Sequence, residues 1–121
     1  MGSLIDTSIL AGAHEIGECA DEWAVSVVTV GEIEAGVLLA RDDATRAGRV
    51  ALLAAVLAEA PALPIDRHVA DHYGELRASS GRRPSNDLWI AATALAHDFT
   101  LVTADEQQAS LPFVRSTLVA I

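Results

Sequence analysis

Short runs of aliphatic residues alternate along the chain with longer segments in which apolar residues recur every three or four positions. The short runs predict β-strands, and the longer segments predict amphipathic helices. The expected strands are Ser3–Asp6, Ala24–Val28, Ala62–Ile65, Thr100–Thr103 and Thr117–Ile121. The expected helices are Ser8–Ala20, Val30–Arg41, Ala44–Glu59, His68–Ser79 and Asn86–His97. This alternation is typical of an α/β fold, so we expect a three-layer α/β/α sandwich around a mostly parallel five-stranded sheet.

The length and composition narrow the class of protein. The chain has 121 residues, so we expect one domain over residues 1–121. Hydrophobic residues make up 51% of it and aromatic residues 4%, which excludes a disordered chain and argues against aromatic platforms for stacking bases. No apolar stretch reaches the roughly 18 to 20 residues of a membrane span, and no secretory signal is visible. We therefore expect no association with a membrane. Because Cys19 is the only cysteine, we expect no disulfide and a reducing, cytoplasmic location.

The charge balance is strongly acidic. Seventeen Asp and Glu residues face eight basic residues, all of them Arg, for a formal net charge of −9. Such a surface repels nucleic acid, because non-specific affinity comes from neutralising phosphates. A nucleic-acid substrate would therefore require local Arg clusters, bound metal ions or a second subunit.

Four acidic residues are predicted to meet at one edge of the sheet. In a doubly wound sheet, ligands bind beyond the carboxyl ends of the strands. Asp6 ends the first predicted strand and Asp105 follows the fourth, and no helix cap is expected for either residue. Asp87 shares a helical stripe with apolar residues, and Glu32 shares its face with small or apolar neighbours, whereas Glu34 points to nearly the opposite side.

Each acid also has a structural interpretation. Thr29 with Glu32, and Thr103 with Glu106, match the spacing of a capping box, and Ser85 is expected to cap the helix that contains Asp87. Four convergent carboxylates, however, would raise one another's pKa unless a cation held them. Oxygen ligands without His or Cys suit Mg²⁺ or Mn²⁺, and such a site is suited to hydrolysing phosphodiester bonds with metal-activated water.

These segments together resemble the PIN-domain family, and within it the VapC-like toxins of bacterial toxin–antitoxin pairs. The similar segments are Leu4–Ser8, Val25–Ile33, Asn86–Ala94, which reads Asn-Asp-Leu-Trp-Ile-Ala-Ala-Thr-Ala, and Leu101–Asp105. The resemblance implies a cytoplasmic, homodimeric, metal-dependent endoribonuclease that cleaves RNA and is inhibited by a cognate antitoxin. Its metal-binding and catalytic acids would be Asp6, Glu32, Asp87 and Asp105, with Mg²⁺ as the ion and Mn²⁺ as a substitute.

The resemblance also implies supporting residues. Ser8 and Thr103 match polar positions that hydrogen-bond the acids or metal-bound water. Asn86 is expected either to touch the substrate or only to begin its helix. Arg82 and Arg83 precede Asp87 and are expected either to contact RNA phosphates or to lie in a solvated loop.

The chain departs from the family in one place. Many relatives have a further Asp followed by Phe shortly after the last acid, where this chain reads Gln107-Gln108-Ala109. Four acids instead of five leave open whether one or two metal ions bind.

Other acidic-pocket and phosphate-binding classes fit poorly. A receiver domain and a P-loop both need Lys, which the chain lacks, and a haloacid-dehalogenase phosphatase would need Asp where Ser8 stands. The remaining alternative is a degenerate PIN domain that binds RNA or protein without cutting it.

Overall fold

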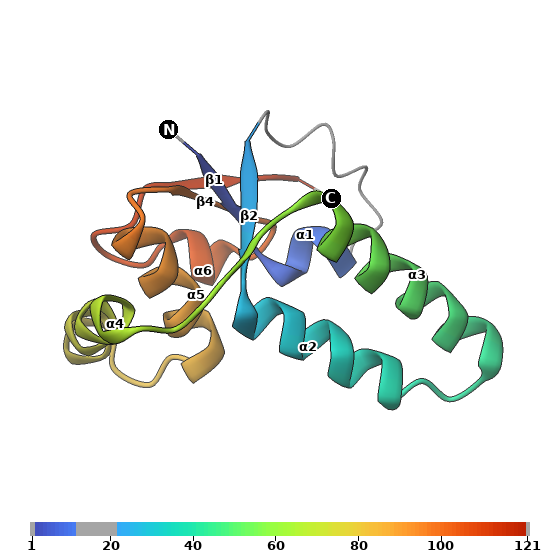
Figure 1. Cartoon of the computed structure of the whole chain (residues 1–121). Helices are drawn as coiled ribbons and strands as arrows, with labels where there is room; N and C mark the ends of the chain where they lie inside the picture. Colours follow the sequence, from blue (N-terminus) through green and yellow to red (C-terminus); the bar gives the residue numbers. More distant parts are fainter. Residues whose placement is uncertain (1, 12–21, 121) are drawn as a thin grey trace.

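The computed structural model describes residues 2–11 and 22–120. The elements, shown in Figure 1, are β1 (Ser3–Ile5), α1 (Thr7–Ala11), β2 (Trp23–Ser26), α2 (Val27–Leu38), α3 (Asp43–Glu59), β3 (Ala62–Leu63), α4 (Arg67–Ser80), α5 (Ser85–Ala96), β4 (Thr100–Thr103), α6 (Glu106–Ala109) and β5 (Ser116–Leu118). Within the described ranges, no helix is long and apolar enough to cross a membrane.

The sheet has five strands in the order β3-β2-β1-β4-β5, and every pairing is parallel. The predicted α/β class and parallel sheet are therefore confirmed. From β1 the chain first adds strands on one side, through β2 and β3, and then on the other, through β4 and β5. The order thus reverses between β1 and β4, which is where open α/β sheets bind their ligands.

Successive strand residues face two different helical layers, because side chains alternate across a strand. Leu4 of β1 packs in a core with residues of α4 and α5, such as Val69 and Leu88. The next residue, Ile5, packs in a second core with Ile33 of α2 and other residues of α1 and α3. Figure 1 shows these helix groups on opposite sides of the strands. The sheet is therefore the middle layer of a sandwich.

Several predicted boundaries differ from the structure. Val27 and Val28 were expected in a strand because they are β-branched, but they begin α2. The cause is Ser26, whose Oγ accepts a hydrogen bond from Val28 N at 3.0 Å and caps the helix. The short helix α6 was not expected. The predicted helix Ser8–Ala20 is described only as α1, and its remainder, with Cys19, lies outside the described residues.

Candidate functional site

Asp6 lies just beyond β1, with 5% of its surface exposed. Its N–H donates to Val102 O at 2.9 Å, which continues the pairing of β1 with β4. Its Oδ2 accepts hydrogen bonds from Ser8 Oγ at 2.7 Å and Thr103 Oγ1 at 2.8 Å. These donors offset the cost of removing a carboxylate from water. They also fix the orientation of Asp6 at the switch point of the sheet.

Thr103, the last residue of β4, links the carboxylate of Asp6 to Asp105, which lies two positions further along the chain. Its Oγ1 donates to Asp6 and also accepts the N–H of Asp105 at 3.1 Å. Ser8 Oγ lies 3.2 Å from the same hydroxyl and accepts the N–H of Ala104 at 2.9 Å. Ser8 and Thr103 therefore lie where supporting residues were expected, between the ends of β1 and β4.

Glu32 reaches the same edge from α2. Its Oε1 accepts a hydrogen bond from Thr7 Oγ1 at 2.7 Å, and the Thr7 hydroxyl also lies 3.1 Å from Thr29 Oγ1. Thr29 is buried inside α2, where it does not cap the helix, so the first predicted capping box is wrong. Sequence reasoning assigned Thr7 no role, and its only signal was its place between Asp6 and Ser8. Glu34 is exposed on the other side of the helix, as its helical phase predicted.

Asp87 lies in the first turn of α5 and is partly buried. Burial raises the pKa of this carboxyl from 3.8 to about 6, together with the negative charges of Asp6, Asp105 and Glu32, while Arg83 lowers it. Asp87 is thus close enough to the other three carboxylates for their charges to act on it. Burial of Asp87, reinforced by these three negative charges, is the main electrostatic feature of the site.

Asp105 has a structural task that was not expected. Its side chain caps α6, because Oδ1 accepts the N–H groups of Gln107 at 2.9 Å and Gln108 at 3.4 Å. The capping box expected from Thr103 and Glu106 is therefore wrong, since Asp105 occupies the cap position. Ser85 was also wrongly expected to cap its helix, because Pro84 occupies that position and makes no side-chain cap.

The donor chemistry of the four acids fits a hard divalent cation. They offer only carboxylate oxygens, which suit Mg²⁺ or Mn²⁺, and repulsion around Asp87 would be relieved by such an ion. Among the residues that the structure describes, no three His, Cys, Asp or Glu side chains already form a group that could hold a metal ion. Binding would therefore require the carboxylates to move toward one another.

The basic and polar residues near Asp87 are used in different ways. Arg82 and Asn86 are exposed. Arg83 donates from Nη1 to Gln107 O at 2.8 Å and from Nη2 to Ser110 Oγ at 3.2 Å, so its guanidinium holds the end of α6. Arg83 therefore stabilises the end of α6 and also places a positive charge near Asp87.

Arg77 of α4 supports the loop that leads to α5. Its Nη1 donates to Gly81 O and to Arg83 O, both at 2.9 Å, and its Nη2 donates to Ser85 Oγ at 3.0 Å. Tyr73, which also contacts Arg77, stacks on Trp89 of α5 with ring centroids 3.8 Å apart. The position of Asp87 is thus set by packing of α5 against α4.

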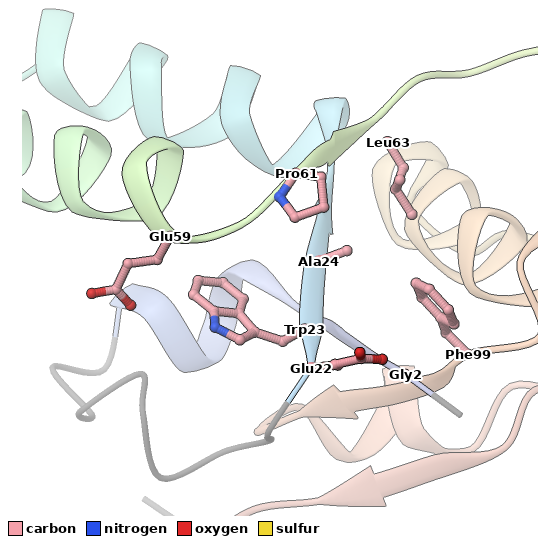
Figure 2. A pocket seen from close by; sticks show the side chains of 8 residues that line it. All are labelled: Gly2, Glu22, Trp23, Ala24, Glu59, Pro61, Leu63 and Phe99. Carbon is pink, nitrogen blue, oxygen red and sulfur yellow. The ribbon is translucent and has the colours of Figure 1, made fainter.

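Two cavities of about 370 Å³ lie in different parts of the described structure. One adjoins the acidic site and is lined by Thr7, Glu32, Ile33, Gly36, Leu39, Arg49 and Leu52. The other, in Figure 2, is lined by Gly2, Glu22, Trp23, Ala24, Glu59, Pro61, Leu63 and Phe99. Because those residues lie at or near the beginnings of the strands, this second cavity is remote from the four acids.

Known proteins are similar to this chain in sequence. The sequence pattern of the PIN domain matches residues 3–114. The chain is 38% identical to Ribonuclease VapC4 of Mycobacterium tuberculosis, over 93% of this chain and 92% of the relative. It is 40% identical to Ribonuclease VapC5 of the same organism, over 89% of this chain and 86% of the relative.

Solved structures agree with the sequence relatives. A chain of VapBC-5, a toxin–antitoxin system member from Mycobacterium tuberculosis, matches with a TM-score of 0.83 and 34% identity, over 99% of this chain and 98% of that one. A chain of VapBC2 from Rickettsia felis, bound to a promoter DNA fragment, matches with a TM-score of 0.81 and 22% identity, over 98% and 99%. The second match shows the fold alone. From its fold, its sequence and these relatives, the chain belongs to the PIN-domain family and to the VapC-like proteins within it.

Proposed function

We propose that this protein is a metal-dependent endoribonuclease that acts as the toxin of a toxin–antitoxin pair. The observation that supports this most is the meeting of four acids at the switch point of the sheet, with the pKa of Asp87 raised to about 6. The relatives named VapC ribonucleases point to RNA as the substrate.

The four acids would together bind Mg²⁺, or Mn²⁺ in its place. Asp6, Asp87 and Asp105 would hold the ion, and Glu32 would do so directly or through water. When bound, a divalent cation supplies activation of the attacking water and neutralisation of charge on the phosphate. Ser8 and Thr103 keep Asp6 oriented, and Thr7 keeps Glu32 oriented. Asp105 would serve both as a ligand and as the cap of α6.

RNA must bind to a chain with a net charge of −9, so its contacts must be local. Arg82 and Asn86 are exposed near Asp87, and we assign them contacts with the RNA backbone. Because Arg83 already donates to α6, it would add positive charge near the phosphate more than new hydrogen bonds.

We further propose that a cognate antitoxin binds this protein, that the toxin forms a homodimer, and that it acts in the cytoplasm, where its RNA would be found. The VapBC-5 structure is of a member of a family of toxin–antitoxin systems. The acidic surface suits a basic partner, and the cavity beside Glu32 offers such a partner apolar contacts next to the site. A second copy would bring additional Arg residues to the RNA.

The alternative is a PIN domain that binds RNA or protein without cutting it. Two observations favour it: Asp105 is engaged in a helix cap, and no described group of three ligands is assembled. A functional test must therefore separate binding from cleavage.

The experiment is cleavage of total bacterial RNA by the purified protein in Mg²⁺ or Mn²⁺, with EDTA as the metal-free arm. We expect cleavage only with metal, and a loss of at least about 100-fold in Asp6→Asn and Asp87→Asn. Glu34→Gln is the matched control, because Glu34 is exposed on the opposite side of α2. Products should end in 5′-phosphate and 3′-hydroxyl groups. Metal-independent products, or 2′,3′-cyclic phosphate ends, would contradict attack by activated water, and RNA binding without cleavage would favour the alternative.

A further inference from the structure

Gln108 of α6 contacts the residues of two proposed metal ligands at once. Its side chain is buried, with 1% of its surface exposed, and Nε2 donates to the backbone oxygen of Asp87 at 2.8 Å. Its own N–H donates to Oδ1 of Asp105 at 3.4 Å. One residue therefore joins the beginning of α5 to the end of β4.

The amide of Gln108 is only half satisfied. Its Oε1 is buried and has no hydrogen-bond partner among the described residues. A buried acceptor without a partner is costly, and an apolar side chain of similar size would fill the same space without that cost. Packing alone thus does not explain a Gln at this position, whereas the hydrogen bond to Asp87 does.

The rest of α6 is held in the same way. This helix has 4 residues, too few to be stable without external contacts. Asp105 caps its beginning, and Arg83 donates to Gln107 O and Ser110 Oγ at its end. Gln108 is the buried contact between these two ends, so changing its side chain would loosen α6 relative to Asp87.

We propose that Gln108 is a positioning residue that fixes the spacing of Asp87 and Asp105 for cation binding. The inference rests on the proposed function, because it assumes that these two acids hold a metal ion. In this proposal Gln108 acts through the backbone of Asp87 and the cap made by Asp105, and it is assigned no contact with the ion or the RNA.

The test compares the wild type with Gln108→Met, which keeps side-chain length and removes both polar atoms, and with Gln108→Leu as a second apolar variant. Gln107→Met is the matched control, because Gln107 is exposed on the same helix. Urea unfolding in EDTA first establishes that each variant folds. Amide hydrogen exchange in EDTA then reports the protection of residues 107–109, and calorimetric titration with Mn²⁺ alone reports metal affinity.

We expect folded Gln108→Met to lose protection at residues 107–109 and to bind Mn²⁺ about 10-fold more weakly, whereas Gln107→Met matches the wild type. In RNA cleavage, saturating Mn²⁺ should restore the rate of Gln108→Met, while the Mn²⁺ concentration giving half the maximal rate rises about 10-fold. A purely structural defect would lower the rate at every Mn²⁺ concentration.

Two further results would overturn the inference, and they are distinguishable. If the wild type binds Mn²⁺ and folded Gln108→Met and Gln108→Leu bind it equally well, Gln108 does not position the ligands. If the wild type neither binds Mn²⁺ nor cleaves RNA, the proposed function fails, and this inference fails with it.

Discussion

Asp87→Asn should stabilise the metal-free protein at neutral pH. The folded structure raises the pKa of Asp87 from 3.8 to about 6, chiefly through burial and then through the negative charges of Asp6, Asp105 and Glu32. A pKa difference of this size corresponds to at most about 3 kcal/mol of folding free energy. Because the carboxylate is partly exposed and screened, and Asn loses the favourable interaction with the helix dipole, we expect a gain of about 1 kcal/mol. That gain raises the melting temperature by about 4 °C.

The pH dependence of this gain follows from the direction of the pKa shift. Between pH 3.8 and about 6 the folded state binds more protons at Asp87 than the unfolded state, so the wild type loses stability as the pH rises. Below that window Asp87 is protonated in both states, and its ionisation no longer separates the two proteins. Above that window the full difference should be present.

The measurement is thermal unfolding of both proteins in EDTA from pH 4 to pH 8, with Glu34→Gln as the control for removing one negative charge. Glu34 is exposed, so its loss should leave the melting temperature nearly unchanged. If Asp87→Asn melts at or below the wild type at pH 7, or if its advantage does not shrink toward pH 4, burial and the neighbouring charges do not raise the pKa of Asp87 in the way described.

Three other contacts give measurable expectations. Thr103→Val removes the 2.8 Å bond to Asp6 and the acceptor for Asp105 N, so urea unfolding should show a loss of about 1 to 3 kcal/mol, with Thr100→Val as the control; an unchanged midpoint would contradict this. Thr7→Val removes the 2.7 Å bond to Glu32 and should slow RNA cleavage about 10-fold while leaving the melting temperature nearly unchanged. Arg77→Met removes hydrogen bonds to Gly81 O, Arg83 O and Ser85 Oγ. It should lower the melting temperature by several degrees, about 4 °C for each kcal/mol of stability lost. Arg67→Met is the control and should leave the melting temperature unchanged, because Arg67 is exposed.

Much of the fold was predictable because the aliphatic runs report the two faces of the sheet directly. Leu4 and Ile5, neighbours in sequence, pack into the two different cores, as a strand between two helical layers requires. β4 ends where it was predicted to end, at Thr103. The acid at the end of β1 was visible for the same reason, since a charge directly after a buried strand is unusual.

The missed features depend on contacts between distant residues. Asp105 caps α6, but a helix of 4 residues leaves no periodicity in the sequence, so neither the helix nor its cap was visible. Thr7 meets Glu32 from 25 positions away along the chain. The bond from Gln108 to Asp87 likewise joins two elements whose approach is set by the packed sheet and helices.

The strand boundary at Ser26 shows a different limit. Val27 and Val28 have the β-branched side chains typical of strands, yet they lie in α2 because the Ser26 hydroxyl caps the helix one turn earlier than expected. Local propensity therefore predicted β2 and α2 but misplaced the point at which the strand ends.

The most direct test of the central claim, that the four acids form a cation site, is calorimetric titration of Mn²⁺ into the purified protein at pH 7 without RNA. The wild type and Glu34→Gln should bind Mn²⁺ saturably and equally, whereas Asp87→Asn should bind it at least about 10-fold more weakly. Absence of saturable binding to the wild type, or equal binding by Asp87→Asn, would contradict the claim.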